Sequence, residues 1–147
     1  MSNLEDSILY PYSPVYTDTF QKGKALNSCK VLEIWKEFES GDVRHRAGYF
    51  SDTITLVFPD QFLRGAKDTV LGSFQKRRNQ FENVQCYIDS WIPVYVPDRN
   101  EDLVFLWGRQ DGSYTGKKRV YRILHEIWRF DTSGKIKRME QYSTHPY

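Results

Sequence analysis

The second half of this chain alternates between apolar and polar residues, interrupted only by short turns, and this pattern leaves few folds open. The alternating stretches cover residues 84–96, 102–110, 118–130 and 135–144. Alternation with a period of two is typical of strands that bury one face, and short turns join neighbouring strands in antiparallel pairs. The pattern therefore predicts an antiparallel meander.

The first half of the chain predicts helices. Apolar residues recur every three residues from Leu26 to Phe38, as on the buried side of a helix. Gly41 is expected to end this helix, and Asp42 to cap a second, shorter helix. A strand over residues 53–58 and a third helix over about 66–80 complete this half. Helices that precede a long, bent sheet indicate an α+β fold, in which the helices cover one sheet face and leave a cavity.

Length and composition indicate one domain with an aromatic-rich interior. The chain has 147 residues, of which 16% are aromatic, and its net charge is +2. A charge this small does not imply a nucleic-acid or acidic partner, and we expect no binding to nucleic acid. Residues 1–23 contain prolines and no sustained period, so we expect an extended N-terminal arm ahead of a single domain over 24–147.

The cysteines, the histidines and the N-terminus argue against cofactors and membranes. Cys29 and Cys86 have no second cysteine nearby, and the three histidines, among them His145, share no ligand spacing, so we predict no metal site and no cofactor. The N-terminus lacks a signal peptide, and no run approaches 18 apolar residues. We therefore expect a cytoplasmic protein.

Three stretches carry a resemblance to a known superfamily: "IWKEFESGD", "YFSDTITLVFPD" and "IWRFDTSGKIKRMEQY". In this order they resemble the nuclear transport factor 2-like superfamily, within it the SnoaL-like and ketosteroid-isomerase-like branch, over about residues 24–145. The resemblance implies a cystatin-like cone, in which a strongly bent antiparallel sheet and three N-terminal helices surround a central pocket. Members of the superfamily include isomerases, dehydratases, epoxide hydrolases, polyketide cyclases and binding modules, so the resemblance does not select an activity.

The resemblance also assigns places to catalytic residues. The isomerases use a base carboxylate, a tyrosine and a protonated carboxylic acid. Glu126 stands in the place of the acid, whereas Phe58 stands in the place of the base and Ile34 in that of the tyrosine. Asp60 lies two residues beyond Phe58 and is the candidate partner of Glu126. Two departures in three argue against steroid-type isomerisation.

The orientation of Glu126 depends on the register of the last hairpin. A four-residue turn over residues 131–134 would pair Glu126 with Met139 and place both on the inner face. Burial there would raise the pKa of Glu126 and suit it to donate a hydrogen bond or act as an acid or base. The alternative is that Lys137 or Arg122 neutralises it as part of the fold.

Further residues are candidates for the pocket wall or for positioning a ligand. Aromatic residues on strands are as often simply core residues, and Arg109 is more often salt-bridged than ligand-binding. The candidate ligand-binding residues are Phe58, Trp91, Trp107, Leu124, Trp128, Met139, Gln141 and Ser143, with Tyr87 as a further aromatic.

Two classes of function remain open. The first choice is a protein that binds a small organic molecule in a mostly apolar, aromatic-lined pocket, and the alternative is an enzyme that uses Glu126, with Asp60, for non-covalent acid–base chemistry. A non-catalytic protein-interaction module is the second alternative. The outer sheet face is too apolar to remain in water, so we predict a homodimer through Tyr121, Ile123, Ile127, Ile136 and Tyr142.

Overall fold

The computed structural model describes residues 7–116 and 118–144, and its strands form one curled sheet. The helices are α1 (Ala25–Ser40), the 3₁₀ helix η2 (Val43–Tyr49) and α2 (Lys67–Asn79). The strands are β1 (Gln21–Lys22), β2 (Phe50–Phe58), β3 (Gln61–Ala66), β4 (Phe81–Val96), β5 (Glu101–Tyr114), β6 (Arg119–Phe130) and β7 (Ile136–Thr144). Within the described residues they lie in the order β1-β4-β5-β6-β7-β2-β3.

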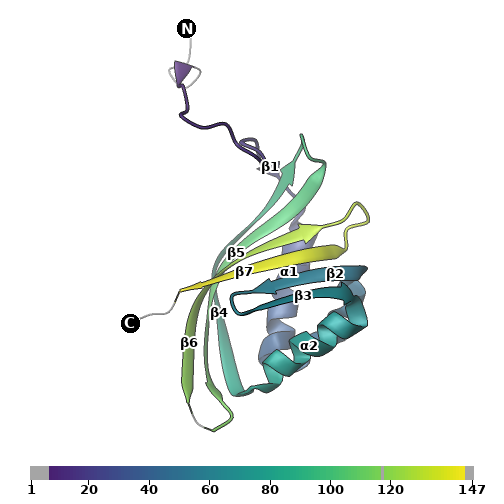
Figure 1. Ribbon diagram of the computed structural model, residues 1–147, viewed down its shortest axis with the longest axis vertical. Coiled ribbons are helices and arrows are strands. Elements are labelled where there is room, and N and C mark those ends of the chain that lie inside the picture. Colours follow the sequence, from purple (N-terminus) through teal and green to yellow (C-terminus); the bar gives the residue numbers. More distant parts are fainter. Residues whose placement is uncertain (1–6, 117, 145–147) are drawn as a thin grey trace.

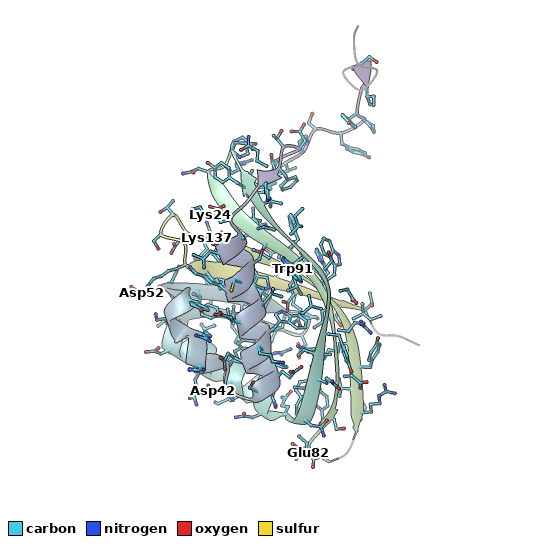
Figure 2. All side chains as sticks on the ribbon, turned by 180° about the vertical axis from the view of Figure 1, so that it is seen from behind. Lys24, Asp42, Asp52, Glu82, Trp91 and Lys137 are labelled. Atoms are coloured by element: carbon cyan, nitrogen blue, oxygen red, sulfur yellow. The ribbon has the colours of Figure 1, made fainter. Side chains whose placement is uncertain are left out.

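The predicted α+β architecture is confirmed. The sheet curls without closing, and helices α1 and α2 lie against its inner side (Figure 1). Helix α1 packs on β4 and β5, and α2 packs on β2 and β3. Figure 2 shows the side chains between α1 and the sheet. The apolar stripe of α1 supplies the helical half of this core, with Val31, Ile34, Trp35 and Phe38 all buried.

The break between the first two helices is the one that the sequence predicts. Gly41 has φ 112°, in the left-handed region, and its backbone N–H donates to the carbonyl oxygen of Glu37. Asp42 then caps η2, because its side chain accepts a hydrogen bond from the backbone N–H of Arg44 at 3.0 Å.

One strand pair departs from the predicted all-antiparallel sheet. Strand β2 pairs with β7 in parallel, with Leu56 opposite Met139. The sequence pattern could not show this pairing, because four strands, β3 to β6, lie between β2 and β7 in the chain. The parallel pair places the end of β2, including Phe58, beside the inner residues of β7.

The register of the β6–β7 hairpin also differs from the prediction. The turn is longer by one residue, so that Phe130 pairs with Ile136, and a shift then leaves Lys137 without a partner residue. The Asp131 side chain holds the turn by accepting hydrogen bonds from the backbone N–H groups of Ser133 and Lys135. Glu126 therefore lies opposite Gln141 rather than Met139.

The longer turn and the bulge at Lys137 each shift the pairing by one residue. From Arg138 onward the two shifts cancel and the residues of β7 lie on their predicted faces, whereas Ile136, between the turn and the bulge, does not. Met139 and Gln141 point inward with Glu126, as expected. Ile136, which was predicted on the outer face, is fully buried with Phe130 on the inner side. A bulge reverses the alternation on one strand only, which explains why this single assignment is wrong.

The N-terminal arm contacts the sheet over only part of its length. The Tyr16 hydroxyl donates to Glu101 at 2.5 Å, and Gln21–Lys22 pair with β4. Figure 1 shows the preceding described residues extending away from the domain, and Leu9, Tyr12 and Val15 are almost fully exposed. No helix in the part of the chain that the structure describes is long and apolar enough to span a membrane.

Candidate ligand site

The site is built around Glu126, a buried carboxyl group in the middle of β6. Its side chain is 3% exposed. Its Oε1 accepts hydrogen bonds from the indole Nε1 of Trp35 at 2.6 Å and of Trp128 at 3.0 Å, and its Oε2 accepts from Gln141 Nε2 at 2.8 Å. All three donors are neutral, and they come from α1, β6 and β7.

A glycine on the neighbouring strand lets Trp35 reach this carboxyl group. A Cβ atom on Gly108 of β5 would lie 2.8 Å from the carbonyl oxygen of Tyr87 and 2.9 Å from Cη2 of Trp35. Both distances are shorter than real carbon contacts allow, so a side chain at position 108 would displace the indole ring. Gly108 therefore permits the close approach of α1 that brings the Trp35 N–H to Glu126.

Among the described residues, no cation forms an ion pair with Glu126. The amino group of Lys137 pairs with Glu101 at 2.8 Å, and Arg122 donates to the hydroxyl of Tyr114 at 2.8 Å. The alternative in which one of these two residues neutralises Glu126 is therefore wrong. Burial raises the pKa of the Glu126 carboxyl, and the hydrogen bonds from Gln141, Trp35 and Trp128 offset only part of this effect.

The hydrogen bonds around Glu126 also accommodate its neutral form. Oε1 already receives two N–H donors, as a carbonyl oxygen can, and Oε2 has one partner, Gln141. The other amide atom of Gln141, Oε1, is buried without a hydrogen-bond partner among the described residues. A 180° rotation of this amide would place its oxygen where a protonated Oε2 can donate to it. Protonation of Glu126 together with rotation of the Gln141 amide would thus give the unpaired Gln141 oxygen a hydrogen-bond donor.

Glu126 lines a narrow inner cavity between the helices and the sheet. Gln141 and Gln110 are the other uncharged polar residues on its wall. The space in which the centre of a water molecule can lie has a volume of about 30 Å³, which is room for one or two waters. The apolar part of the wall consists of Ile34, Trp35, Phe38, Phe58, Phe74, Phe81, Trp128 and Met139.

Two arginines separate this inner cavity from a larger outer cleft. Arg77 of α2 and Arg122 of β6 line both spaces. The guanidinium of Arg77 lies over the ring of Phe58, 3.9 Å from its centroid, and that of Arg122 lies 5.5 Å from the centroid of Phe81. By the same measure the outer cleft has a volume of about 390 Å³. We call Arg77 and Arg122 the mouth arginines.

Asp60, the predicted partner of Glu126, belongs to the outer cleft and not to the inner cavity. It forms an ion pair with Arg77 at 3.0 Å, and the hydrogen bond from this guanidinium is the main reason why the pKa of Asp60 is lowered. Asp60 and Glu126 thus have separate environments. Ser143 also lines the outer cleft.

The structure brings together about half of the predicted ligand-binding residues. Phe58, Trp128, Met139 and Gln141 line the inner cavity with Glu126, while Leu124 is buried in the adjoining core. The sequence analysis did not single out the mouth arginine Arg77, or Gln110 and the Trp35 indole, as site residues. Trp35 could have been predicted from its place on the buried stripe of α1, because a buried indole N–H requires a hydrogen-bond acceptor.

Two of the predicted tryptophans lie outside the cavity. Trp107 is 42% exposed on the outer face, where its ring stacks on His125 at a centroid distance of 4.9 Å. Trp91 is 49% exposed and lies on β4, near the edge of the sheet (Figure 2). Tyr87 is also exposed, beneath the guanidinium of Arg109, which pairs with Asp89 at 3.2 Å. Trp107 follows the buried Leu106 along β5, so the alternation of the strand directs its ring to the outer face.

The described residues contain no cluster of three or more histidine, cysteine, aspartate or glutamate side chains arranged to hold a metal. His145 lies outside the described residues.

Comparison with solved structures identifies the fold. AusH from Aspergillus nidulans is 20% identical, with a TM-score of 0.64 over 86% of this chain and 89% of its own. An NTF2-like protein of unknown function from Burkholderia pseudomallei is 14% identical, with a TM-score of 0.66 over 82% and 92% of the two chains. The epoxide hydrolase/cyclase-like enzyme SalBIII, described in pyran ring formation in the polyether salinomycin, is also 14% identical, with a TM-score of 0.64 over 81% and 91%.

These similarities show the nuclear transport factor 2-like fold that the sequence resemblance predicted. Searches of protein-family models and of curated proteins find no match.

Proposed function

We propose that this chain, which has the nuclear transport factor 2-like fold, binds a small and mostly apolar organic molecule in its inner cavity. The observation that carries the proposal is the buried carboxyl of Glu126, whose partners within residues 7–116 and 118–144 are three neutral hydrogen-bond donors and no cation. A buried carboxyl without a charge partner destabilises the fold. Its position on the wall of an aromatic cavity supports a role in ligand recognition.

Glu126 and Gln141 supply the polar end of the proposed site. With Glu126 neutral and the Gln141 amide rotated as described above, the amide N–H₂ group is released from Glu126 and can donate to a ligand. With Glu126 ionised, the unpaired Gln141 oxygen is available as an acceptor instead. The apolar wall contributes affinity through burial, and this pair contributes orientation.

A ligand larger than two waters enters only if the cavity widens. The mouth arginines are the side chains that can provide this widening, because they are long and lie at the boundary with the outer cleft. Arg122 is held there by the neutral hydroxyl of Tyr114 and the face of Phe81. Binding therefore involves displacement of these side chains, and the aromatic core remains in place.

Catalysis is the second candidate function. The raised pKa of Glu126 suits a general acid or base that exchanges one proton with a bound molecule. Asp60 is outside the inner cavity and Phe58 cannot accept a proton, so such a reaction would use Glu126 as its single titrating carboxyl. The epoxide hydrolase/cyclase-like SalBIII has the same fold, which supports this candidate by analogy alone.

We also propose that a second copy of the chain covers the outer sheet face. The rings of Trp107, His125 and Tyr142 form a stacked row there, and the ring of Phe105 also stacks on His125. Ile123 and Tyr142, two of the predicted interface residues, are 41% and 55% exposed. An apolar row of this kind is suited to a two-fold interface, or to the alternative of a protein-interaction module. We also propose a cytoplasmic location, on the basis of the N-terminal sequence and the lack of a long apolar run.

Binding of a neutral apolar fluorophore tests the proposed function. N-Phenyl-1-naphthylamine becomes more fluorescent when it leaves water for an apolar site, so titration measures its affinity. We expect binding by the wild-type chain and a loss of at least tenfold in the Ile34→Phe variant, which fills the cavity. Ile92→Phe, an exposed position outside the cavity, is the matched control. Equal affinity of Ile34→Phe and wild type would place the binding elsewhere.

A further inference from the structure

We infer that the molecule bound in the inner cavity carries an acidic group, such as a carboxylate, sulfonate or phosphate, and that Arg77 and Arg122 bind this group at the mouth. The inference rests on the proposed function and names the class of ligand. It follows from the charges of the outer cleft, from the partners of the mouth arginines and from their position between the two spaces.

The outer cleft has an excess of positive charge. Its charged lining residues are Asp60 and four cations, namely Arg77, Lys118, Arg119 and Arg122. The whole chain has a net charge of only +2, so this cleft is more cationic than the protein as a whole. A concave surface lined by one sign of charge concentrates ligands of the opposite sign.

Of the three arginines that line the cleft, Arg77 and Arg119 each pair with a carboxylate, whereas Arg122 has no ion-pair partner among the described residues. Arg119 pairs with Asp111 at 3.0 Å on the exposed side of the cleft. Arg77 pairs with the exposed carboxylate of Asp60 at 3.0 Å. Arg122 forms no ion pair with a described residue, and its Nη2 donates to the neutral hydroxyl of Tyr114. A guanidinium has five N–H donors in a planar fork, so Arg122 retains donors for a bidentate acidic group.

The geometry of the two spaces explains why one molecule would use both. Arg77 and Arg122 line the inner cavity together with Phe58 and Phe81, and they also line the outer cleft. A molecule with its apolar body among the aromatic rings therefore ends at the mouth arginines. The opposite orientation is unfavourable, because an acidic group at the inner end would meet the buried carboxyl of Glu126.

Two fluorophores with the same ring system separate this inference from the proposed function. 8-Anilinonaphthalene-1-sulfonate carries a sulfonate, and N-phenyl-1-naphthylamine is the same molecule without it. We expect the sulfonate to bind the wild-type chain at least tenfold more tightly than the neutral probe. Added salt should weaken the binding of the sulfonate and leave the neutral probe unchanged.

Substitutions at the mouth give the decisive comparison. Arg122→Gln and Arg77→Gln should each weaken sulfonate binding by about tenfold or more, and they should change the affinity of the neutral probe much less, because only the sulfonate uses the guanidinium charge. Arg64→Gln, an exposed arginine of β3 outside both spaces, is the matched control and should change neither. Far-ultraviolet circular dichroism and the melting temperature verify that each variant is folded.

The outcomes distinguish the two proposals. If both probes bind with equal affinity, or if Arg122→Gln weakens both equally, the acidic-group inference is overturned and the cavity remains a ligand site. If neither probe binds the folded wild-type chain, the proposed function fails and this inference fails with it. Sulfonate binding that is lost in Arg64→Gln as well would reflect non-specific attraction to cations, and it would also overturn the inference.

Discussion

The indole Nε1 of Trp35 lies 2.6 Å from Oε1 of Glu126, although the two residues are 91 positions apart in the chain. This hydrogen bond ties helix α1 to the centre of the sheet at the wall of the inner cavity. The sequence predicted Glu126 as a candidate catalytic residue and Trp35 only as a core residue. The predictions below test this contact, the packing that permits it, the state of the carboxyl group and the outer face.

The Glu126→Gln substitution should make the protein more stable at neutral pH. The pKa of Glu126 is raised in the folded state, so the folded protein binds this proton more tightly than the unfolded chain does. Wild-type stability therefore falls as pH rises above the unfolded pKa of about 4.3, and the fall continues until pH passes the folded pKa. The variant has no such carboxyl, and the amide preserves the shape of the side chain.

Thermal melts of both proteins between pH 4 and 8 measure this effect. The melting temperature of Glu126→Gln should exceed that of wild type by an amount that grows with pH over this window. Glu82→Gln, at an exposed position, is the control and should follow wild type. A variant that is less stable than wild type at pH 7 would show that Glu126 is held ionised.

The Trp35→Phe substitution should destabilise the fold by about 1–3 kcal/mol, the usual cost of losing a buried hydrogen bond together with some packing. Since this N–H stabilises the ionised carboxyl, its removal should also raise the pKa of Glu126 further. Urea unfolding and carbon-13 NMR of the Glu126 carboxyl measure the two effects. Trp107→Phe, on the outer face, should leave this pKa unchanged, and an equal shift in both variants would contradict the assignment.

The Gly108→Ala substitution should cost about 1–3 kcal/mol, because the new methyl group would collide with the Tyr87 carbonyl and the Trp35 ring. The displaced ring should also weaken ligand binding in the cavity. Gly72→Ala in α2 is a control of opposite sign: its Cβ meets nothing within 4 Å, and alanine favours the helix by roughly 0.5–1 kcal/mol. Denaturant unfolding measures the free energy of unfolding of both variants. Equal stabilities would show that the position of the Trp35 ring does not require glycine at position 108.

The Ile123→Asp substitution should dissociate the proposed dimer, because it places a charge in the middle of the apolar outer face. Sedimentation velocity should show a wild-type dimer and a monomeric variant with unchanged circular dichroism. Leu26→Asp, an exposed apolar position on α1, is the control and should remain dimeric. If the wild-type chain sediments as a monomer at high concentration, the proposed dimer is wrong.

Local periodicity was enough to predict most of the elements. Helix α1 with its end at Gly41, the strands of the meander and the inward direction of Glu126 all follow from residue spacing. The misplacement of Ile136 has a local cause as well: the longer turn and the unpaired Lys137 depend on hydrogen bonds to the Asp131 side chain, which a count of residues does not reveal.

The contents of the site could not be read from spacing, because they depend on which elements meet. Trp107 and Trp128 both alternate on strands of the same sheet, yet one lies on the exposed face and the other beside Glu126. Trp91 on β4 is 49% exposed and does not line the cavity. Similarly, Arg77 and Arg122 come from α2 and β6, and only the curl of the sheet brings them to one mouth.

The sequence by itself determined the class of fold and the face on which Glu126 lies, because the periods of helices and strands are set by the local backbone. The tertiary structure decided what that carboxyl group meets: two indoles and an amide, and no cation from the part of the chain that the structure describes. Hydrogen bonds and charges act over a few ångströms in space, and the residues they join here are up to 91 positions apart in the chain. The environment of Glu126, and with it the chemistry available there, therefore exists only in the folded protein.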